Sequence, residues 1–152
     1  MRLFFYGTLL DADVQSIVLG RVLARQDVIP AILRHFRCVY IAGRIYPMVV
    51  PQRGGVVEGV VAYRLSPEDL ARIAIYEGDD YRCERYLVLP SACEGQPSLT
   101  TPAPLAAWLY RSRPNLRPSS REWRLASWQA AKKNSYLRTM EKTSQRNLGR
   151  GL

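Results

Sequence analysis

The pattern of apolar and polar positions begins with a short aromatic segment. Residues 2–6 form an apolar run rich in Phe and Tyr that Gly7 interrupts, which predicts a buried first strand. Asp11 or Asp13 then stands where the N-cap of a short helix is expected, and Gly20 is placed to end that helix.

The next part of the chain is rich in β-forming residues. Residues 31–41 alternate loosely, and residues 46–50 form a second extended piece that a turn at Gly54-Gly55 is expected to close. Residues 56–65 alternate more clearly, which predicts a strand with one buried face. Gly59 lies inside this strand and indicates a bulge or a close approach of another backbone.

A helix with strong start and stop signals follows. Ser66 is a natural N-cap, Pro67 suits the first helical position, acidic residues follow in the first turn, and Gly78 marks the end. Strands are predicted at residues 86–89 and 105–110.

Signals in the last third are mixed. Residues 91–104 contain one Gly and three Pro among polar residues and predict a long surface loop. The Ser119-x-x-Glu122 motif is typical of a capping box and predicts a second long helix, which we expect to fray beyond Thr139. The whole pattern predicts an α+β (mixed α/β) domain of about six strands and two or three helices.

Charge is distributed unevenly along the 152 residues. The first 110 residues carry eleven basic and eleven acidic side chains, whereas residues 111–152 carry eleven basic and only two acidic ones. The net charge of +9 therefore belongs to the C-terminal segment. We predict a single domain over residues 1–140 and a basic, flexible tail at 141–152, which is a candidate for phosphate contacts or simply a solvated segment.

Several classes of protein are disfavoured by composition. Three Cys without metal-ligand spacing and a single His make a zinc site improbable. No stretch approaches ~20 apolar residues, and the N-terminus lacks the layout of a signal peptide. We therefore expect a cytoplasmic protein that does not span a membrane.

Glu77 is the first candidate for chemistry. It shares one helix face with Leu70, Ile73 and Ala74, which are expected to pack on the sheet. A carboxyl group that closes an apolar face is partly desolvated, and desolvation raises its pKa toward values useful for a general acid or base. The alternative is that Glu77 turns into water just past the helix.

Residues Tyr6, Gly7, Thr8 and Leu9 are the second candidate. A buried strand that ends at Gly leaves its next backbone N–H groups unpaired, and such groups bind a carboxylate or a developing oxyanion. The alternative is an ordinary turn after a strand.

Together these segments resemble a known family. The matching residues are Phe5-Tyr6-Gly7-Thr8-Leu9, Gly43 with Tyr46-Pro47, Val57-Glu58-Gly59-Val60-Val61-Ala62-Tyr63, Leu70, and Tyr76-Glu77-Gly78-Asp79-Asp80-Tyr81. Their order and spacing over roughly residues 3–110 resemble the gamma-glutamylcyclotransferase-like family, which includes gamma-glutamylamine cyclotransferases.

The resemblance implies a small mixed-strand β-barrel with flanking helices and a cyclotransferase that releases 5-oxoproline. It implies that Glu77 is the catalytic acid and base, that the Tyr6–Leu9 backbone binds the glutamyl group, and that no metal or cofactor is needed. Tyr81, Tyr46 and Tyr110 are further candidates for the pocket. The implied partner is a small gamma-glutamyl compound.

Two other functions stay open at this point. One is a non-catalytic protein of the same fold that binds an acidic metabolite. The other, less favoured, is a basic protein whose tail contacts nucleic acid or another polyanion, although no nucleic-acid-binding motif accompanies the charge.

Overall fold

Five strands of the protein close into a mixed β-barrel. The structure is a computed structural model that describes residues 1–91 and 102–148; the side chains of residues 144–148 are not described. The order β3-β1-β5-β4-β2 is closed by pairing of β2 with β3, and β6 extends the sheet beyond β2. β1 pairs with β5 in parallel and the other pairs are antiparallel. The strands are β1 Leu3–Phe5, β2 Val28–Ile41, β3 Pro47–Ala62, β4 Tyr81–Pro90, β5 Leu105–Ser112 and β6 Pro118–Glu122.

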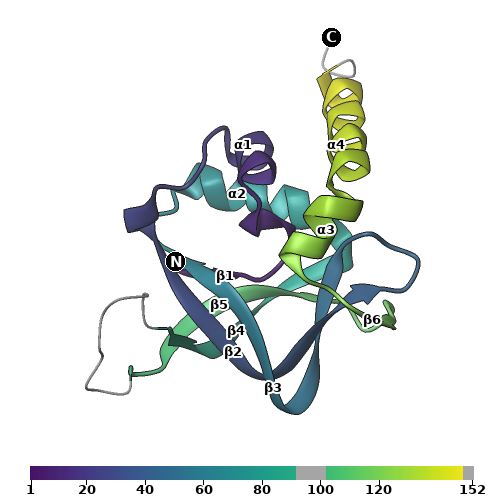
Figure 1. The fold of residues 1–152 in the computed structure, drawn as a ribbon. Coiled ribbons are helices and arrows are strands. Elements are labelled where there is room, and N and C mark those ends of the chain that lie inside the picture. Colours follow the sequence, from purple (N-terminus) through teal and green to yellow (C-terminus); the bar gives the residue numbers. More distant parts are fainter. Residues whose placement is uncertain (92–101, 149–152) are drawn as a thin grey trace.

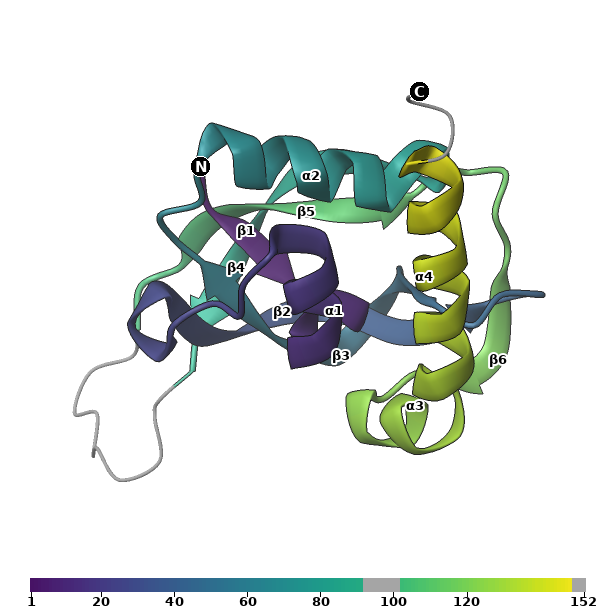
Figure 2. The same cartoon turned by 90° about the horizontal axis from the view of Figure 1, so that it is seen from above.

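Helices flank the barrel on one side (Figures 1 and 2). They are α1 Ala12–Leu19, α2 Pro67–Glu77, α3 Leu125–Ala131 and α4 Lys133–Leu148, with 3-10 turns at Thr8–Leu10, Arg25–Asp27 and Gly78–Asp80. The predicted α+β barrel with flanking helices is confirmed.

Side chains alternate along β1 and divide the core in two. Phe4 lies in the cluster that fills the barrel, whereas Leu3 and Phe5 lie in the cluster between the barrel and the helices. All three are at most 5% exposed. A strand buried on both faces explains why residues 2–6 read as a continuous apolar run.

Gly59 allows the barrel to close around β1. A Cβ atom at this position would lie 2.1 Å from the carbonyl oxygen of Phe5 and 2.7 Å from the ring of Phe4. The close backbone approach predicted for Gly59 is thus confirmed, and no larger residue fits without displacing β1.

The turn predicted at Gly54-Gly55 is wrong. β3 continues from Pro47 to Ala62, and its register against β2 shifts between Arg34 and Phe36. Gly54 has a φ of +78° and its N–H donates to Nδ1 of His35 at 3.2 Å. The glycines therefore form a bulge that bends the β2–β3 pair and do not reverse the chain.

The C-terminal prediction also needs correction. Ser119 and Glu122 lie in β6, and Ser119 Oγ accepts from the N–H of Arg121 instead of capping a helix. The helix begins only at Leu125 and breaks after Ala131, and α4 then continues to Leu148, well past the expected fraying point. Of the loop predicted at 91–104, residues 92–101 lie outside the described residues.

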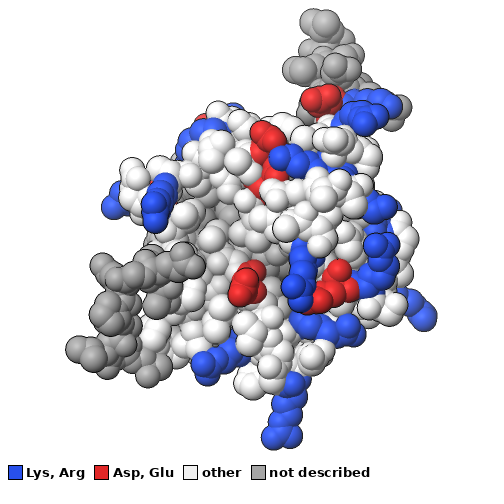
Figure 3. Space-filling model, in the orientation of Figure 1, with Lys and Arg blue, Asp and Glu red and all other residues white. Residues whose placement is uncertain are grey.

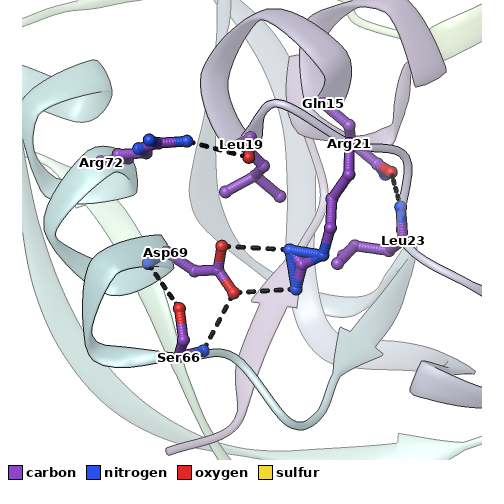
Figure 4. A network of polar contacts seen from close by, with 7 residues as sticks. All are labelled: Gln15, Leu19, Arg21, Leu23, Ser66, Asp69 and Arg72. Atoms are coloured by element: carbon purple, nitrogen blue, oxygen red, sulfur yellow. Dashed lines mark hydrogen bonds and ion pairs between the residues drawn. The ribbon is translucent and has the colours of Figure 1, made fainter.

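A polar network ties α2 to α1 (Figure 4). Ser66 and Asp69 form a reciprocal capping box at the start of α2. The guanidinium of Arg21 donates to both carboxylate oxygens of Asp69, at 3.0 and 2.8 Å. Arg72 donates to the carbonyl oxygen of Leu19, where α1 ends. These contacts fix the N-terminal half of α2 against α1, and the helix then runs on to Glu77 at its other end.

Candidate active site

Glu77 is the last residue of α2 and stands at the junction of helix and barrel. Leu70 and Ile73 pack into the core as predicted, but Ala74 is exposed, so the apolar face is narrower than expected. Gly78 follows with φ 62° and ψ −155°, a backbone conformation available almost only to Gly. This sharp change of direction ends the helix and leads the chain into β4.

Glu77 borders a small inner space of about 30 Å³, enough for roughly one water molecule. The structure brings six of the seven predicted binding residues to this space, namely Tyr6, Gly7, Thr8, Leu9, Tyr81 and Tyr110, together with Leu3, Phe4, Phe5 and Pro47.

The turn after β1 contributes Gly7, Thr8 and Leu9 to the lining of this space. The chain makes a 3-10 turn at Thr8–Leu10, with hydrogen bonds from Leu10 N–H to Gly7 O and from Asp11 N–H to Thr8 O. The first N–H groups of such a turn have no partner inside it. Within residues 1–91 and 102–148, no hydrogen bond is donated by the N–H of Gly7, Thr8 or Leu9. These donors remain available for an anionic group.

A larger outer cavity of about 310 Å³ lies against the other side of Glu77. It shares Thr8, Glu77 and Tyr81 with the inner space, so the two adjoin. The remaining lining residues are Tyr46, Tyr76, Gly78, Asp79, Asp80 and Tyr136. Tyr46, the seventh predicted residue, is found here.

Tyrosine hydroxyls around Glu77 are engaged as donors. Tyr6 donates to the carbonyl oxygen of Tyr110 and Tyr81 to that of Pro47, both at 2.5 Å. Burial raises the pKa of Tyr110 to about 12, and it raises the pKa of Tyr6 and Tyr81 well above the ordinary value. These phenols stay protonated at neutral pH, so they shape the site and do not act as bases.

Burial raises the pKa of Glu77 from 4.5 to about 8. The alternative in which Glu77 turns into water is therefore disfavoured. A carboxyl group with such a pKa holds a proton in much of the neutral range and releases it readily, which suits both general acid and general base chemistry.

A chain of hydroxyl groups runs along the outer cavity. Thr8 Oγ1 lies 2.5 Å from Tyr76 Oη, and Tyr76 Oη is hydrogen-bonded to Tyr136 Oη. Sequence reasoning named Thr8 but missed Tyr76 and Tyr136 as site residues. Tyr76 is next to Glu77 in the sequence, whereas Tyr136 lies about 60 positions further along the chain, where no sequence signal links it to the site.

Surface charge and metal-ligating residues form no concentrated group among the described residues on the face that Figure 3 draws. On the face drawn in Figure 3, Lys and Arg side chains lie at several separate places with Asp and Glu between some of them. Among the described residues, no group of three or more His, Cys, Asp or Glu is arranged to hold a metal ion. In the same part of the chain, no helix is both long and apolar enough to cross a membrane.

Comparisons with known proteins point to one family. A family model described as "Gamma-glutamyl cyclotransferase, AIG2-like" matches residues 3–130. An AIG2-like protein A from Arabidopsis thaliana is 26% identical over 93% of this chain and 79% of its own length. An AIG2-like protein D from the same plant is 25% identical over 95% of this chain and 90% of its own length.

Solved structures share the fold. A solution structure of an Arabidopsis thaliana protein has a TM-score of 0.63 and 24% identity, and covers 96% of this chain and 91% of that one. A gamma-glutamyl cyclotransferase structure has a TM-score of 0.55 and 12% identity, and covers 93% and 86%.

Proposed function

The chain belongs to the AIG2-like gamma-glutamyl cyclotransferase family, and from this membership we propose that it is a cytoplasmic enzyme that converts a gamma-glutamyl amine or gamma-glutamyl amino acid into 5-oxoproline and free amine. The α-nitrogen of the substrate attacks its own γ-carbonyl carbon, and the bond from that carbon to the leaving nitrogen breaks. The α-nitrogen starts as an ammonium group and ends as a lactam N–H. Two protons therefore move, in net terms, from the α-nitrogen to the leaving nitrogen.

Glu77 is the group that carries protons in this proposal. Burial raises its pKa to about 8, closer to that of an amino group than an ordinary carboxyl group would be, so proton transfer from the substrate ammonium to Glu77 costs less free energy. The carboxylate first accepts a proton from the substrate ammonium. The resulting carboxylic acid then protonates the leaving nitrogen as its bond to the γ-carbon breaks. The regenerated carboxylate takes the second proton from the former ammonium nitrogen and passes it to the released amine, which departs as an ammonium ion.

The turn after β1 holds the glutamyl end where Thr8 reaches the outer cavity, because the inner space has room for only about one water molecule. The unpartnered N–H groups of Gly7, Thr8 and Leu9 are suited to bind the α-carboxylate or the oxyanion that develops on the γ-carbonyl oxygen. Because the attack is intramolecular, much of the acceleration comes from holding the substrate in its folded conformer. The outer cavity adjoins Glu77 and is assigned to the amine side.

One observation carries the proposal: Glu77, a half-buried carboxyl group whose pKa burial raises, lines the same space as Gly7, Thr8 and Leu9 of the turn after β1. The test is release of 5-oxoproline from a panel of gamma-glutamyl compounds by wild type and by Glu77→Gln. We expect kcat/KM to fall by at least ~100-fold in the variant, since the amide cannot exchange protons.

Glu68→Gln is the matched control because it makes the same change on the same helix, and among the described residues Glu68 forms an ion pair only with Arg72, at the surface. It should retain wild-type activity. Equal release by wild type and Glu77→Gln would remove Glu77 from the mechanism. Binding of an acidic metabolite without turnover of any compound would instead favour the non-catalytic alternative.

A further inference from the structure

Helix α4 follows an abrupt break after α3. Lys132 has φ −126° and ψ −22°, which ends α3, and α4 starts at the next residue. In Figures 1 and 2 α4 extends away from α3 on the helix side of the barrel. All of α4 lies beyond residue 130, where the match to the family model ends.

A buried carboxylate connects this helical junction to the substrate-binding turn. Asp11 is 1% exposed, and its Oδ2 accepts from Lys133 Nζ at 2.9 Å and from Gln129 Nε2 at 2.8 Å. Its Oδ1 caps α1 through the N–H groups of Asp13 and Val14. Burial opposes ionisation, but these hydrogen bonds outweigh it and lower the pKa of Asp11, so the carboxylate is charged.

Asp11 immediately follows the turn that reaches the site. Its own N–H donates to the carbonyl oxygen of Thr8 at 3.0 Å. Lys133 also pairs with Asp13 at 2.6 Å, so the first residue of α4 is held by two carboxylates. We call this set, Asp11, Asp13, Gln129 and Lys133, the latch.

Tyr136 is three residues after Lys133 and therefore on the same side of α4. Its ring packs edge-on against Trp128 at 5.4 Å between centroids, and Trp128 is fully buried with Nε1 donating to the carbonyl oxygen of Ile45 at 2.9 Å. The hydroxyl of Tyr136 is hydrogen-bonded to the hydroxyl of Tyr76, which in turn is hydrogen-bonded to Thr8 Oγ1. Packing and hydrogen bonding thus fix Tyr136 as a wall of the outer cavity.

We propose that Tyr136 determines which amines fit the site and that Lys133 and Asp11 are positioning residues that dock it there. This inference rests on the proposed function, because it assigns the outer cavity to the leaving amine. The phenol ring limits the space available on the amine side. If the ion pairs of Lys133 with Asp11 and Asp13 are broken, α4 is no longer held in place and Tyr136 no longer lines the outer cavity.

The experiment compares two substrates that differ only in amine size, gamma-glutamylmethylamine and gamma-glutamylbenzylamine. In Tyr136→Ala we expect the ratio of kcat/KM for the benzyl over the methyl compound to rise by about tenfold or more, since the cavity gains room. Tyr136→Phe keeps the ring and should keep the wild-type ratio. Thr139→Ala, at an exposed position on the same helix, is the control and should also leave the ratio unchanged.

The latch is tested by a pair of adjacent lysines. Lys133→Gln should shift the ratio in the same direction as Tyr136→Ala. Lys132→Gln removes the same charge, and Lys132 makes no ion pair within the described residues, so its ratio should stay at the wild-type value. Tyr136→Leu replaces Tyr136→Ala if circular dichroism shows that the alanine variant does not fold.

The outcomes separate this inference from the function on which it rests. An active wild type whose ratio does not change in a folded Tyr136→Ala or Tyr136→Leu variant overturns the role of Tyr136 alone. Equal ratios for Lys133→Gln and Lys132→Gln overturn the latch. A wild type that releases no 5-oxoproline from any gamma-glutamyl compound overturns both the function and the inference.

Discussion

From the raised pKa of Glu77 we predict how the free energy of unfolding depends on pH, which can be measured without a substrate. The carboxyl group titrates near 4.5 when unfolded and near 8 when folded, so between these pH values the folded state binds a proton that the unfolded state does not. The free energy of unfolding then falls as pH rises, by about 1.4 kcal/mol per pH unit. From pH 4.5 to above 8 the loss is on the order of 5 kcal/mol for this group.

Glu77→Gln removes the titrating group and keeps nearly the same shape. We expect the variant to gain stability over wild type as pH rises through this window, with little further change above it. Urea denaturation of both proteins at intervals from pH 4.5 to 9 measures the difference, and the contributions of other groups, such as Asp11, cancel in it. A difference in the free energy of unfolding that does not vary with pH would show that the carboxyl group of Glu77 is solvated. Its pKa would then be ordinary, and it would be poorly suited to exchange protons at neutral pH.

Three further substitutions test how the barrel and the site are built. Gly59→Ala should prevent β1 from pairing and leave little folded protein, because its Cβ would lie 2.1 Å from Phe5 O; a native circular dichroism spectrum would contradict this. Gly78→Ala should lower the free energy of unfolding by about 1–3 kcal/mol through its φ of 62° and ψ of −155°; wild-type stability in urea would show that the conformation is not required. Trp128→Phe should cost about 2–3 kcal/mol because the ring is fully buried and Ile45 O loses its donor; an unchanged melting temperature would contradict that packing.

The sequence predicts correctly the helices whose ends depend on capping residues close by in the chain. Asp11 caps α1, Ser66 caps α2, and Gly20 and Gly78 end these helices, because a cap depends on residues within one turn. Glu77 is a different case, because helical spacing groups it with Leu70 and Ile73 but also with the exposed Ala74, so spacing alone leaves the position of its carboxyl group open.

Tertiary pairing decides the elements that the sequence predicts wrongly. The Ser119-x-x-Glu122 motif has the spacing of a capping box, yet β6 pairs with β2 at Val39 and Ile41, and the pairing prevails over the local preference. The Gly54-Gly55 pair is likewise absorbed as a bulge, since β2 pairs with β3 on both sides of it.

The outer cavity is the part of the site that sequence reasoning reaches least. Tyr136 meets Tyr76 across 60 positions of the chain, and Thr8 is a further 68 positions away from Tyr76. No periodicity within α4 distinguishes a residue that packs in the core from one that lines a cavity, because both lie on the inner face.

The parallel pairing of β1 with β5 has a consequence for how the protein is made. Leu3 is opposite Trp108, and the N–H of Trp108 donates to the carbonyl oxygen of Arg2 at 2.9 Å. β1 therefore completes its pairing only with a strand from the last third of the chain. During synthesis β1 has an unpaired edge until β5 leaves the ribosome. Contacts this distant in sequence make folding slow and leave an exposed edge that other chains can join. The turn after β1, which lines the inner space beside Glu77, is therefore fully supported only once β5 has joined the barrel.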